Sequence, residues 1–184
     1  MSQSRPFRTL GSRIAWACPW YRVREDTIQL PDGSKGVYNV VEHPGAVWIV
    51  PLTADGEVVM LRHYRYTVDD WCWEVPAGGL KNGQRPDDAA REELAQEIGG
   101  EADAWRYIGP FYGSNGISNE QGHIFLALGV RLGLPDHEPA EVIEIHRKPL
   151  REALRMAQAN EISDGPSALA LFLSAPVLRE EGWL

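Results

Sequence analysis

Two Asp-Gly pairs, each set between runs of strand-forming residues, constrain the fold of this chain more than any other feature. Asp32-Gly33 lies inside "YRVREDTIQLPDGSKGVYNVVEHPG", and Asp55-Gly56 lies inside "AVWIVPLTADGEVVMLRHYRY". Aspartate followed by glycine tolerates the positive φ angles of a tight turn, so each pair predicts an antiparallel hairpin. The apolar runs beside the second pair do not alternate with polar residues, which predicts strands buried on both faces.

The rest of the chain alternates further strands with helices. Residues 1–13 show no such pattern and are expected to form a loose arm. A helix is predicted over 86–98, where Ala90, Leu94 and Ile98 lie four residues apart and form an apolar stripe. The sum is an α+β chain, a mixed β-sheet flanked by helices with an N-terminal β-hairpin as an additional layer. The other predicted strands are "DDWCWEVPAGG", "WRYIGPFYGS", "GHIFLALGVRL" and "EVIEIHRK", and the other predicted helices are "PLREALRMAQANE" and "PSALALFLSAPVLREE".

Length, charge and cysteine content exclude several classes of protein. The 184 residues suffice for one domain with a hydrophobic core and a small appendage. The formal net charge of -8 argues against binding to nucleic acid through phosphate contacts. Cys18 and Cys72 belong to no CxxC pair, so neither a zinc site nor a disulfide framework is expected. No apolar run approaches membrane-spanning length, and we expect a cytoplasmic protein without a membrane partner.

An acidic helix follows a glycine-rich loop in the middle of the chain. Pro86 fits the first turn of this helix and Gly99 fits its left-handed end. Glu93 and Glu97 are four residues apart, so they share one face, where their like charges repel. A divalent cation removes that repulsion, and Mg²⁺ prefers carboxylate oxygens and also bridges to phosphate. The pattern indicates a metal site, with a solvated acidic face as the alternative.

The segment "PAGGLKNGQRPDDAAREELAQEIGG" resembles the Nudix box. That pattern is Gly, five residues, Glu, seven residues, then Arg-Glu-aliphatic-any-Glu-Glu-any-Gly-aliphatic. Aligned on this chain, it begins at Gly78, and Glu93, Leu94, Glu97 and Gly99 match it. The spacing is intact. Four positions depart from the pattern: Gln84 replaces Glu, Glu92 replaces Arg, Gln96 replaces Glu and Gly100 replaces an aliphatic residue.

The resemblance extends over residues 19–173, to the ADP-ribose and nucleotide-sugar pyrophosphatase branch of that family. Segments that carry it include "LRHYRY", "WEVPAGG" and "FYGSNGISNEQGHIFLA". It implies a Nudix fold, a mixed β-sheet sandwiched between helices, with an N-terminal antiparallel β extension. Residues 1–43 would be the arm and hairpin, exchanged between the subunits of a homodimer, and residues 44–184 would be the hydrolase domain.

The same resemblance implies a set of metal ligands. Glu93, Glu97 and the carbonyl of Ala77 would bind Mg²⁺, with Mn²⁺ as the alternative ion. Gln96 occupies a further ligand position, where its uncharged amide oxygen predicts weaker binding of one ion. Gly78 would let the main chain approach the substrate closely.

Catalysis then needs a group that accepts a proton from the attacking water. In the family this base often comes from a loop after the central strands, which here is "LPDHEPAEVIEIH". Glu141 is the first candidate and Glu138 the second, with an acidic surface loop as the alternative for either residue.

Substrate-binding residues are implied on three other segments. Arg65 matches an arginine that contacts substrate phosphate, while Arg62 faces the opposite side of the same strand, with a structural ion pair as its alternative. Glu120 matches a residue near the terminal ribose or the metals, with a loop-capping role as the alternative. Trp20 and Tyr21 would stack on the base, in the pocket of the neighbouring subunit.

These features predict metal-dependent hydrolysis of the pyrophosphate bond of a nucleoside diphosphate sugar, with ADP-ribose as the first candidate. The products would be a nucleoside monophosphate and a sugar phosphate. The substitutions at Gln84, Glu92 and Gln96 motivate an alternative, a catalytically impaired sensor that binds nucleotide sugars. A hydrolase of oxidised nucleoside triphosphates is a third hypothesis, disfavoured by the N-terminal β extension.

Overall fold

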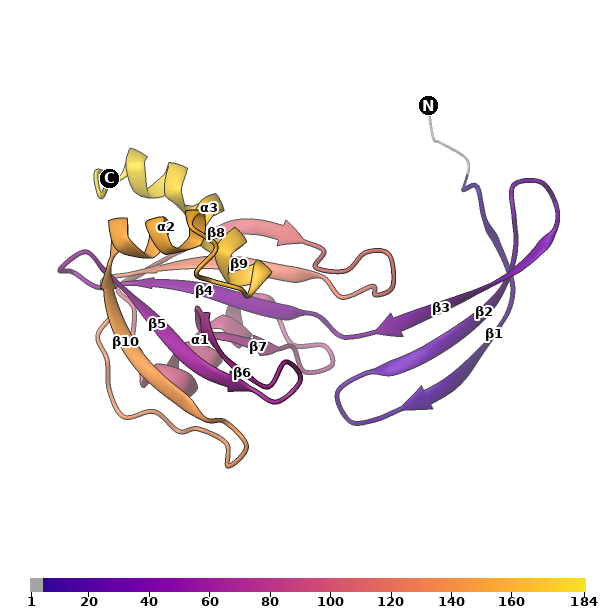
Figure 1. Cartoon of the computed structure of the whole chain (residues 1–184), viewed down its shortest axis with the longest axis horizontal. Helices are drawn as coiled ribbons and strands as arrows, with labels where there is room; N and C mark the ends of the chain where they lie inside the picture. Colours follow the sequence, from indigo (N-terminus) through magenta and orange to yellow (C-terminus); the bar gives the residue numbers. More distant parts are fainter. Residues whose placement is uncertain (1–4) are drawn as a thin grey trace.

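The computed structural model describes residues 5–184, which form two β-sheets and three helices. Figure 1 shows the larger sheet between its helices and the smaller, N-terminal sheet extending away from them. Residues 43–45 connect the two sheets. In residues 5–184, no helix is long and apolar enough to cross a membrane.

The smaller sheet is antiparallel throughout, with the strand order β1-β2-β3. It comprises β1 (Arg8–Ala17), β2 (Arg22–Gln29) and β3 (Lys35–Glu42). Gly33 has a φ of 87° in the turn between β2 and β3, and the carboxylate of Asp32 accepts a main-chain hydrogen bond at 3.0 Å in the same turn. The first predicted hairpin is therefore confirmed.

The expectation of a loose arm over residues 1–13 is wrong from Arg8 onward, where β1 pairs with β2. Residues 1–4 of that arm lie outside the described part of the chain. Every residue of β1 is exposed, so this strand is held by main-chain hydrogen bonds and cross-strand pairs such as Arg13 with Glu25 at 2.8 Å. A strand without a buried face has no hydrophobic alternation, which is why its sequence resembles an arm.

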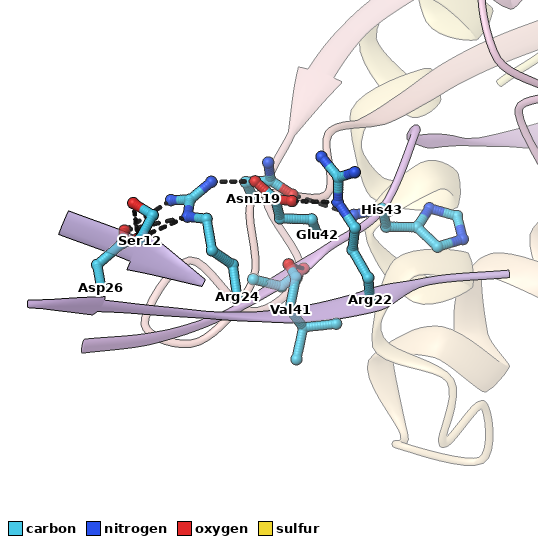
Figure 2. A network of polar contacts seen from close by, with 9 residues as sticks. Ser12, Arg22, Arg24, Asp26, Val41, Glu42, His43 and Asn119 are labelled. Atoms are coloured by element: carbon cyan, nitrogen blue, oxygen red, sulfur yellow. Dashed lines mark hydrogen bonds and ion pairs between the residues drawn. The ribbon is translucent and has the colours of Figure 1, made fainter. Parts of the chain in front are cut away.

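A line of charged side chains crosses one face of the smaller sheet (Figure 2). The guanidinium of Arg24 binds Asp26 at 2.9 Å and also binds Glu42, which in turn pairs with Arg22. The hydroxyl of Ser12 donates to Asp26 at 2.6 Å. These contacts tie all three strands together and end at the junction with the larger sheet.

The larger sheet has the strand order β10-β5-β4-β9-β8, with β6 beside β5 and β7 beside β4. Strands β4 and β9 are parallel, and the other pairs are antiparallel. The second predicted hairpin joins β4 to β5 and is confirmed. The strands are β4 (Ala46–Leu52), β5 (Glu57–Arg65), β6 (Asp70–Glu74), β7 (Ala77–Gly79), β8 (Ala104–Phe111), β9 (Gly122–Leu128) and β10 (Ile143–Pro149).

Helices cover both faces of this sheet. Helix α1 (Pro86–Ile98) packs on one face, while α2 (Leu150–Gln158) and α3 (Gly165–Glu180) pack on the other. Successive residues of β4 and β5 point to opposite faces, so each strand supplies both apolar clusters. The predicted fold, a mixed sheet between helices with an N-terminal antiparallel extension, is confirmed.

Helix α1 begins and ends as its sequence predicts. Pro86 occupies the first turn, and Gly99 adopts a left-handed φ of 61° while its N–H binds a carbonyl of the last turn at 2.9 Å. The predicted apolar stripe is buried: Ala90, Leu94 and Ile98 are at most 1% exposed. This anchoring fixes which face of the helix carries its acidic residues toward β7.

We expect Gly99→Ala to destabilise the protein more than Gly56→Ala does. Both glycines have positive φ, but a Cβ at Gly99 would lie 2.4 Å from the carbonyl carbon of Gly133, whereas at Gly56 the nearest atom, in Trp183, is 3.9 Å away. Backbone strain alone costs about 1 kcal/mol, and a clash with fixed main chain raises the loss to about 2–4 kcal/mol. Urea unfolding of both variants measures the difference. Equal losses would contradict the close approach at Gly99.

Candidate active site

Two adjoining cavities form a cleft at the junction of the two sheets. The larger, of about 700 Å³, is lined by the ends of β5, β6 and β7, including Arg65 and Gly78. The smaller, of about 330 Å³, is lined by the β1–β2 turn, including Trp20 and Tyr21. His43 lines both cavities, so the two cavities meet at this residue, between the two sheets.

Two carboxylates of α1 lie against the main chain of β7. Glu97 is only 3% exposed, and one of its oxygens accepts a hydrogen bond from the N–H of Ala77 at 2.9 Å. The carboxylate of Glu93 lies so close to Gly78 that a Cβ there would be 2.1 Å from the Glu93 Cδ. Only glycine fits at this position while Glu93 keeps its place.

Burial raises the pKa of both carboxylates. For Glu93, burial first and then the negative charges of Glu92 and Glu141 together raise the pKa to about 7. Burial also raises the pKa of Glu97 well above its usual value, although the N–H of Ala77 partly opposes the rise. Near neutral pH, this pair therefore favours a bound proton or cation over two free negative charges.

The β9–β10 loop brings further acidic residues to α1. The main-chain N–H of Asp136 and the ring of His137 each bind a carbonyl in the last turn of α1 at 2.7 Å. After these two contacts along the loop, the N–H of Glu138 donates to the carboxylate of Glu141 at 2.7 Å. The negative charge of Glu141 raises the pKa of both Glu93 and Glu97. The structure thus brings the two candidate bases to the candidate metal ligands.

The donor set suits a hard divalent cation. Glu93 and Glu97 supply carboxylate oxygens whose negative charges are not fully balanced by nearby positive groups. Gln96 lies half-buried beside Glu97, and the main chain of Ala77 lies against Glu97. Within residues 5–184, no three Asp, Glu, His or Cys side chains form a metal-binding group by themselves. Mg²⁺ tolerates such a set, because it keeps several waters and completes its shell with phosphate oxygens.

Arg65 enters the larger cavity paired with a residue that sequence analysis did not identify. Glu74, on β6, is 4% exposed and binds the guanidinium of Arg65 at 2.9 and 2.6 Å. The Nδ1 of His63 lies 3.6 Å from Glu74, beyond hydrogen-bond range. Burial would raise the pKa of Glu74, but His63 and Arg65 outweigh it and hold the pKa below its usual value. Its only signal in the sequence is a carboxylate directly after Trp73 in a strand that contains two tryptophans.

Arg62 and Arg65 face opposite sides of β5, as their spacing predicts. The guanidinium of Arg62 lies over the ring of Trp73, 5.2 Å from its centroid, on the side that α2 and α3 cover. Arg62 lines neither cavity of the cleft. The structure therefore does not bring it together with the other candidate substrate-binding residues, and its contact is a cation–π pair instead of the anticipated ion pair.

The remaining candidates lie along the cleft. Glu120 lines the larger cavity and pairs with His43 at 3.0 Å. Trp20 and Tyr21 line the smaller cavity of their own chain. Asn119 fastens the β8–β9 loop to this junction by accepting a hydrogen bond from the N–H of His43 at 3.1 Å (Figure 2).

Two of the unusual positions in the box are partners of each other. Glu92 pairs with Lys81 and accepts a hydrogen bond from the amide of Gln84 at 2.9 Å. The amide oxygen of Gln84 in turn accepts the main-chain N–H of Lys81 at 2.9 Å. Lys81 thus supplies the positive charge that the family pattern has at position 92, and the three residues hold the glycine-rich loop against α1.

Comparisons with known protein families agree with this arrangement. Residues 42–168 match the NUDIX domain family, and residues 7–41 match the nucleoside diphosphate sugar hydrolase N-terminal domain. In fold, the chain is similar to a crystal structure described as an ADP compounds hydrolase, with a TM-score of 0.85, 18% identity and complete coverage of both chains.

Several proteins of known name are similar in sequence. An ADP-ribose pyrophosphatase of Mycobacterium tuberculosis is 34% identical, over 85% of this chain and 77% of its own length. An ADP-ribose pyrophosphatase of Bacillus subtilis is 32% identical, over 79% of this chain and 80% of its own. A methanol dehydrogenase activator of Bacillus methanolicus is 30% identical, over 82% of each chain.

In the absence of divalent cations, we expect Glu93 to make stability fall as pH rises. Between its ordinary pKa of 4.5 and its folded pKa of about 7, the folded protein holds a proton that the unfolded chain has released. The free energy of unfolding therefore declines across this window. Glu93→Gln should flatten the decline and, allowing for partial exposure, stabilise the protein by about 1 kcal/mol above pH 7.

Thermal unfolding in EDTA from pH 5 to 8 tests this expectation. Adding Mg²⁺ should also flatten the decline in the wild-type protein, because the ion replaces the lost proton. Glu152→Gln, on α2, is the matched control, since Arg155 lowers the pKa of Glu152 and removing this carboxylate relieves no such decline. An unchanged pH dependence in Glu93→Gln would contradict the assignment.

The pair of box substitutions should behave as a coupled unit. Glu92→Arg alone places a second cation beside Lys81, and Gln84→Glu alone places a second carboxylate beside Glu92, so each should lower Tm by about 2 °C. The double variant restores an acid–base pair and should recover the wild-type Tm. Differential scanning fluorimetry of the four proteins measures the coupling. Additive losses in the double variant would show that the two positions are independent.

Proposed function

Because this chain belongs to the Nudix hydrolase family, we propose that it hydrolyses the pyrophosphate bond of a nucleoside diphosphate sugar, with ADP-ribose as the first candidate. The products are a nucleoside monophosphate and a sugar phosphate. One observation carries the proposal: the half-buried Glu93 and the buried Glu97 lie against β7 beside Gly78, at the larger of two adjoining cavities, the smaller of which is lined by an aromatic turn.

Nudix hydrolases in general need a divalent metal ion, and we assign its site to the β7–α1 region. Glu93 and Glu97 would hold it, with the main chain of Ala77 and the amide of Gln96 nearby. Mg²⁺ is our first choice and Mn²⁺ the second. When bound, the ion supplies positive charge to the pyrophosphate oxygens and makes water more acidic.

Residues of this chain then direct the attack of water on phosphorus. Glu141 accepts a proton from the water, with Glu138 as the second candidate, and the P–O bond to the leaving phosphate breaks. Arg65 donates hydrogen bonds to a phosphate in the larger cavity. The anchoring of the β9–β10 loop on α1 supports this assignment, since it holds Glu141 near Glu93 and Glu97.

The length of the cleft suits a ligand with two ends. We assign the base to the smaller cavity, against Trp20 and Tyr21, and the sugar to the end of the larger cavity near Glu120.

A second subunit would complete the pocket for the base. Several large apolar side chains of the smaller sheet are exposed, including Trp16 at 52% and Val37 at 62%. We propose that they are covered in a homodimer, and a monomer in light scattering would contradict this.

Turnover is a better hypothesis than sensing without catalysis. Lys81 compensates for the charge changes at positions 84 and 92, so the substitutions leave the glycine-rich loop attached to α1. Two of the three carboxylates that the box pattern offers to a metal ion, Glu93 and Glu97, are present. A sensor would bind nucleotide sugars without cleaving them.

We expect the wild-type protein to release a nucleoside monophosphate from at least one member of a panel of nucleoside diphosphate sugars in Mg²⁺ or Mn²⁺. Glu97→Gln should lower kcat by at least about 100-fold, because it removes charge from the ion site. Glu101→Gln, an exposed carboxylate just beyond α1, is the control and should keep full activity. Binding without turnover in the wild-type protein would favour the sensor, and unchanged turnover in Glu97→Gln would remove this residue from the mechanism.

A further inference from the structure

The floor of the larger cavity contains an ion pair with an unusual division of exposure. Both residues line the cavity, but the side chain of Glu74 is only 5% exposed, whereas the side chain of Arg65 is 42% exposed. Glu74 therefore offers a ligand far less surface than Arg65 does. A buried carboxylate is costly unless it is paired, and Arg65 is the partner that compensates Glu74.

The geometry of this pair leaves part of the arginine free. The carboxylate of Glu74 accepts hydrogen bonds from Nε of Arg65 at 2.9 Å and from Nη2 at 2.6 Å. This bidentate pairing occupies one edge of the guanidinium. A guanidinium has five N–H donors in one plane. Within residues 5–184, Nη1 of Arg65 makes no hydrogen bond, so the edge formed by Nη1 and the second N–H of Nη2 remains available. That edge matches two oxygens of one phosphate.

A second carboxylate lies near the same arginine. Glu97 and Arg65 are close enough for each to stabilise the charged form of the other. Glu97 is also one of the two residues assigned to the ion site. If Arg65 turned toward Glu97, it would neutralise a carboxylate that the divalent cation needs, and its free edge would no longer face the cavity.

We propose that Glu74 is a positioning residue: by binding Nε and Nη2 of Arg65, it keeps the guanidinium away from Glu97 and presents its free edge to a substrate phosphate. This inference rests on the proposed function. It has a consequence opposite to that of simple electrostatics. Removing the charge of Glu74 leaves Arg65 with an uncompensated positive charge, which by itself would attract a phosphate more strongly. Positioning predicts weaker binding instead.

The test uses Glu74→Gln, Arg65→Lys and the double variant, with AMP as a ligand that contains a phosphate but no pyrophosphate bond. In calorimetry with Mg²⁺, Glu74→Gln should weaken AMP binding by about 10-fold, as expected for loss of an oriented charge-assisted hydrogen bond. It should also raise the Mg²⁺ concentration needed for half-maximal turnover. In the Arg65→Lys background, Glu74→Gln should add little, because Glu74 acts through Arg65.

Two further variants separate positioning from folding. Glu74→Asp keeps the charge and should recover part of the AMP affinity even if Glu74→Gln folds poorly by circular dichroism. Glu57→Gln removes a carboxylate of β5 that pairs with Arg147 at 3.8 Å, and it should leave AMP binding unchanged. Tighter or unchanged AMP binding in Glu74→Gln, or an equal loss in the Arg65→Lys background, would overturn the inference. AMP binding is measured without turnover, so a wild-type protein that cleaves no nucleotide sugar would reject the proposed function separately.

Discussion

The burial of Glu97 and the partial burial of Glu93 beside it form the constraint on which the rest of this structure depends. Two like charges on one helical face are held against β7 only because the apolar face of α1 is buried and because position 78 has no side chain. The cost of this arrangement appears as raised pKa values for both carboxylates. It makes the region a site for a positive charge, and the surrounding loops carry the groups that a phosphate substrate and its attacking water require.

Most of the fold could be predicted from the sequence, because its elements depend on local patterns. The Asp-Gly turns, the apolar runs of β4 and β5, and the proline and glycine at the ends of α1 each specify their own element. Strand β1 could not be predicted in this way. Its residues are exposed, and its conformation comes from hydrogen bonds to β2. No periodicity within residues 8–13 reports such a partner.

The candidate site could be predicted only in part. The spacing of Glu93 and Glu97 places them on one face, and the alternation along β5 separates Arg62 from Arg65. Glu74 and His137 were missed because the role of each depends on a contact with another segment of the chain. Glu74 meets Arg65 through the pairing of β5 with β6, and His137 reaches α1 through the fold of a long loop. Lys81 was missed because no spacing rule links a lysine in a loop to a glutamate in the middle of the following helix. Its contact with Glu92 nevertheless accounts for the charge changes at positions 84 and 92.

The parallel pairing of β4 with β9 at the centre of the larger sheet affects how the protein is made. Strands β4 and β5 are contiguous and close a hairpin quickly, but the other edge of β4 waits for residues 122–128. Loop closure over so many residues slows folding, and on the ribosome β9 emerges well after β4. During synthesis, one edge of the most apolar strand thus stays open. Protection of the nascent chain matters most in that interval.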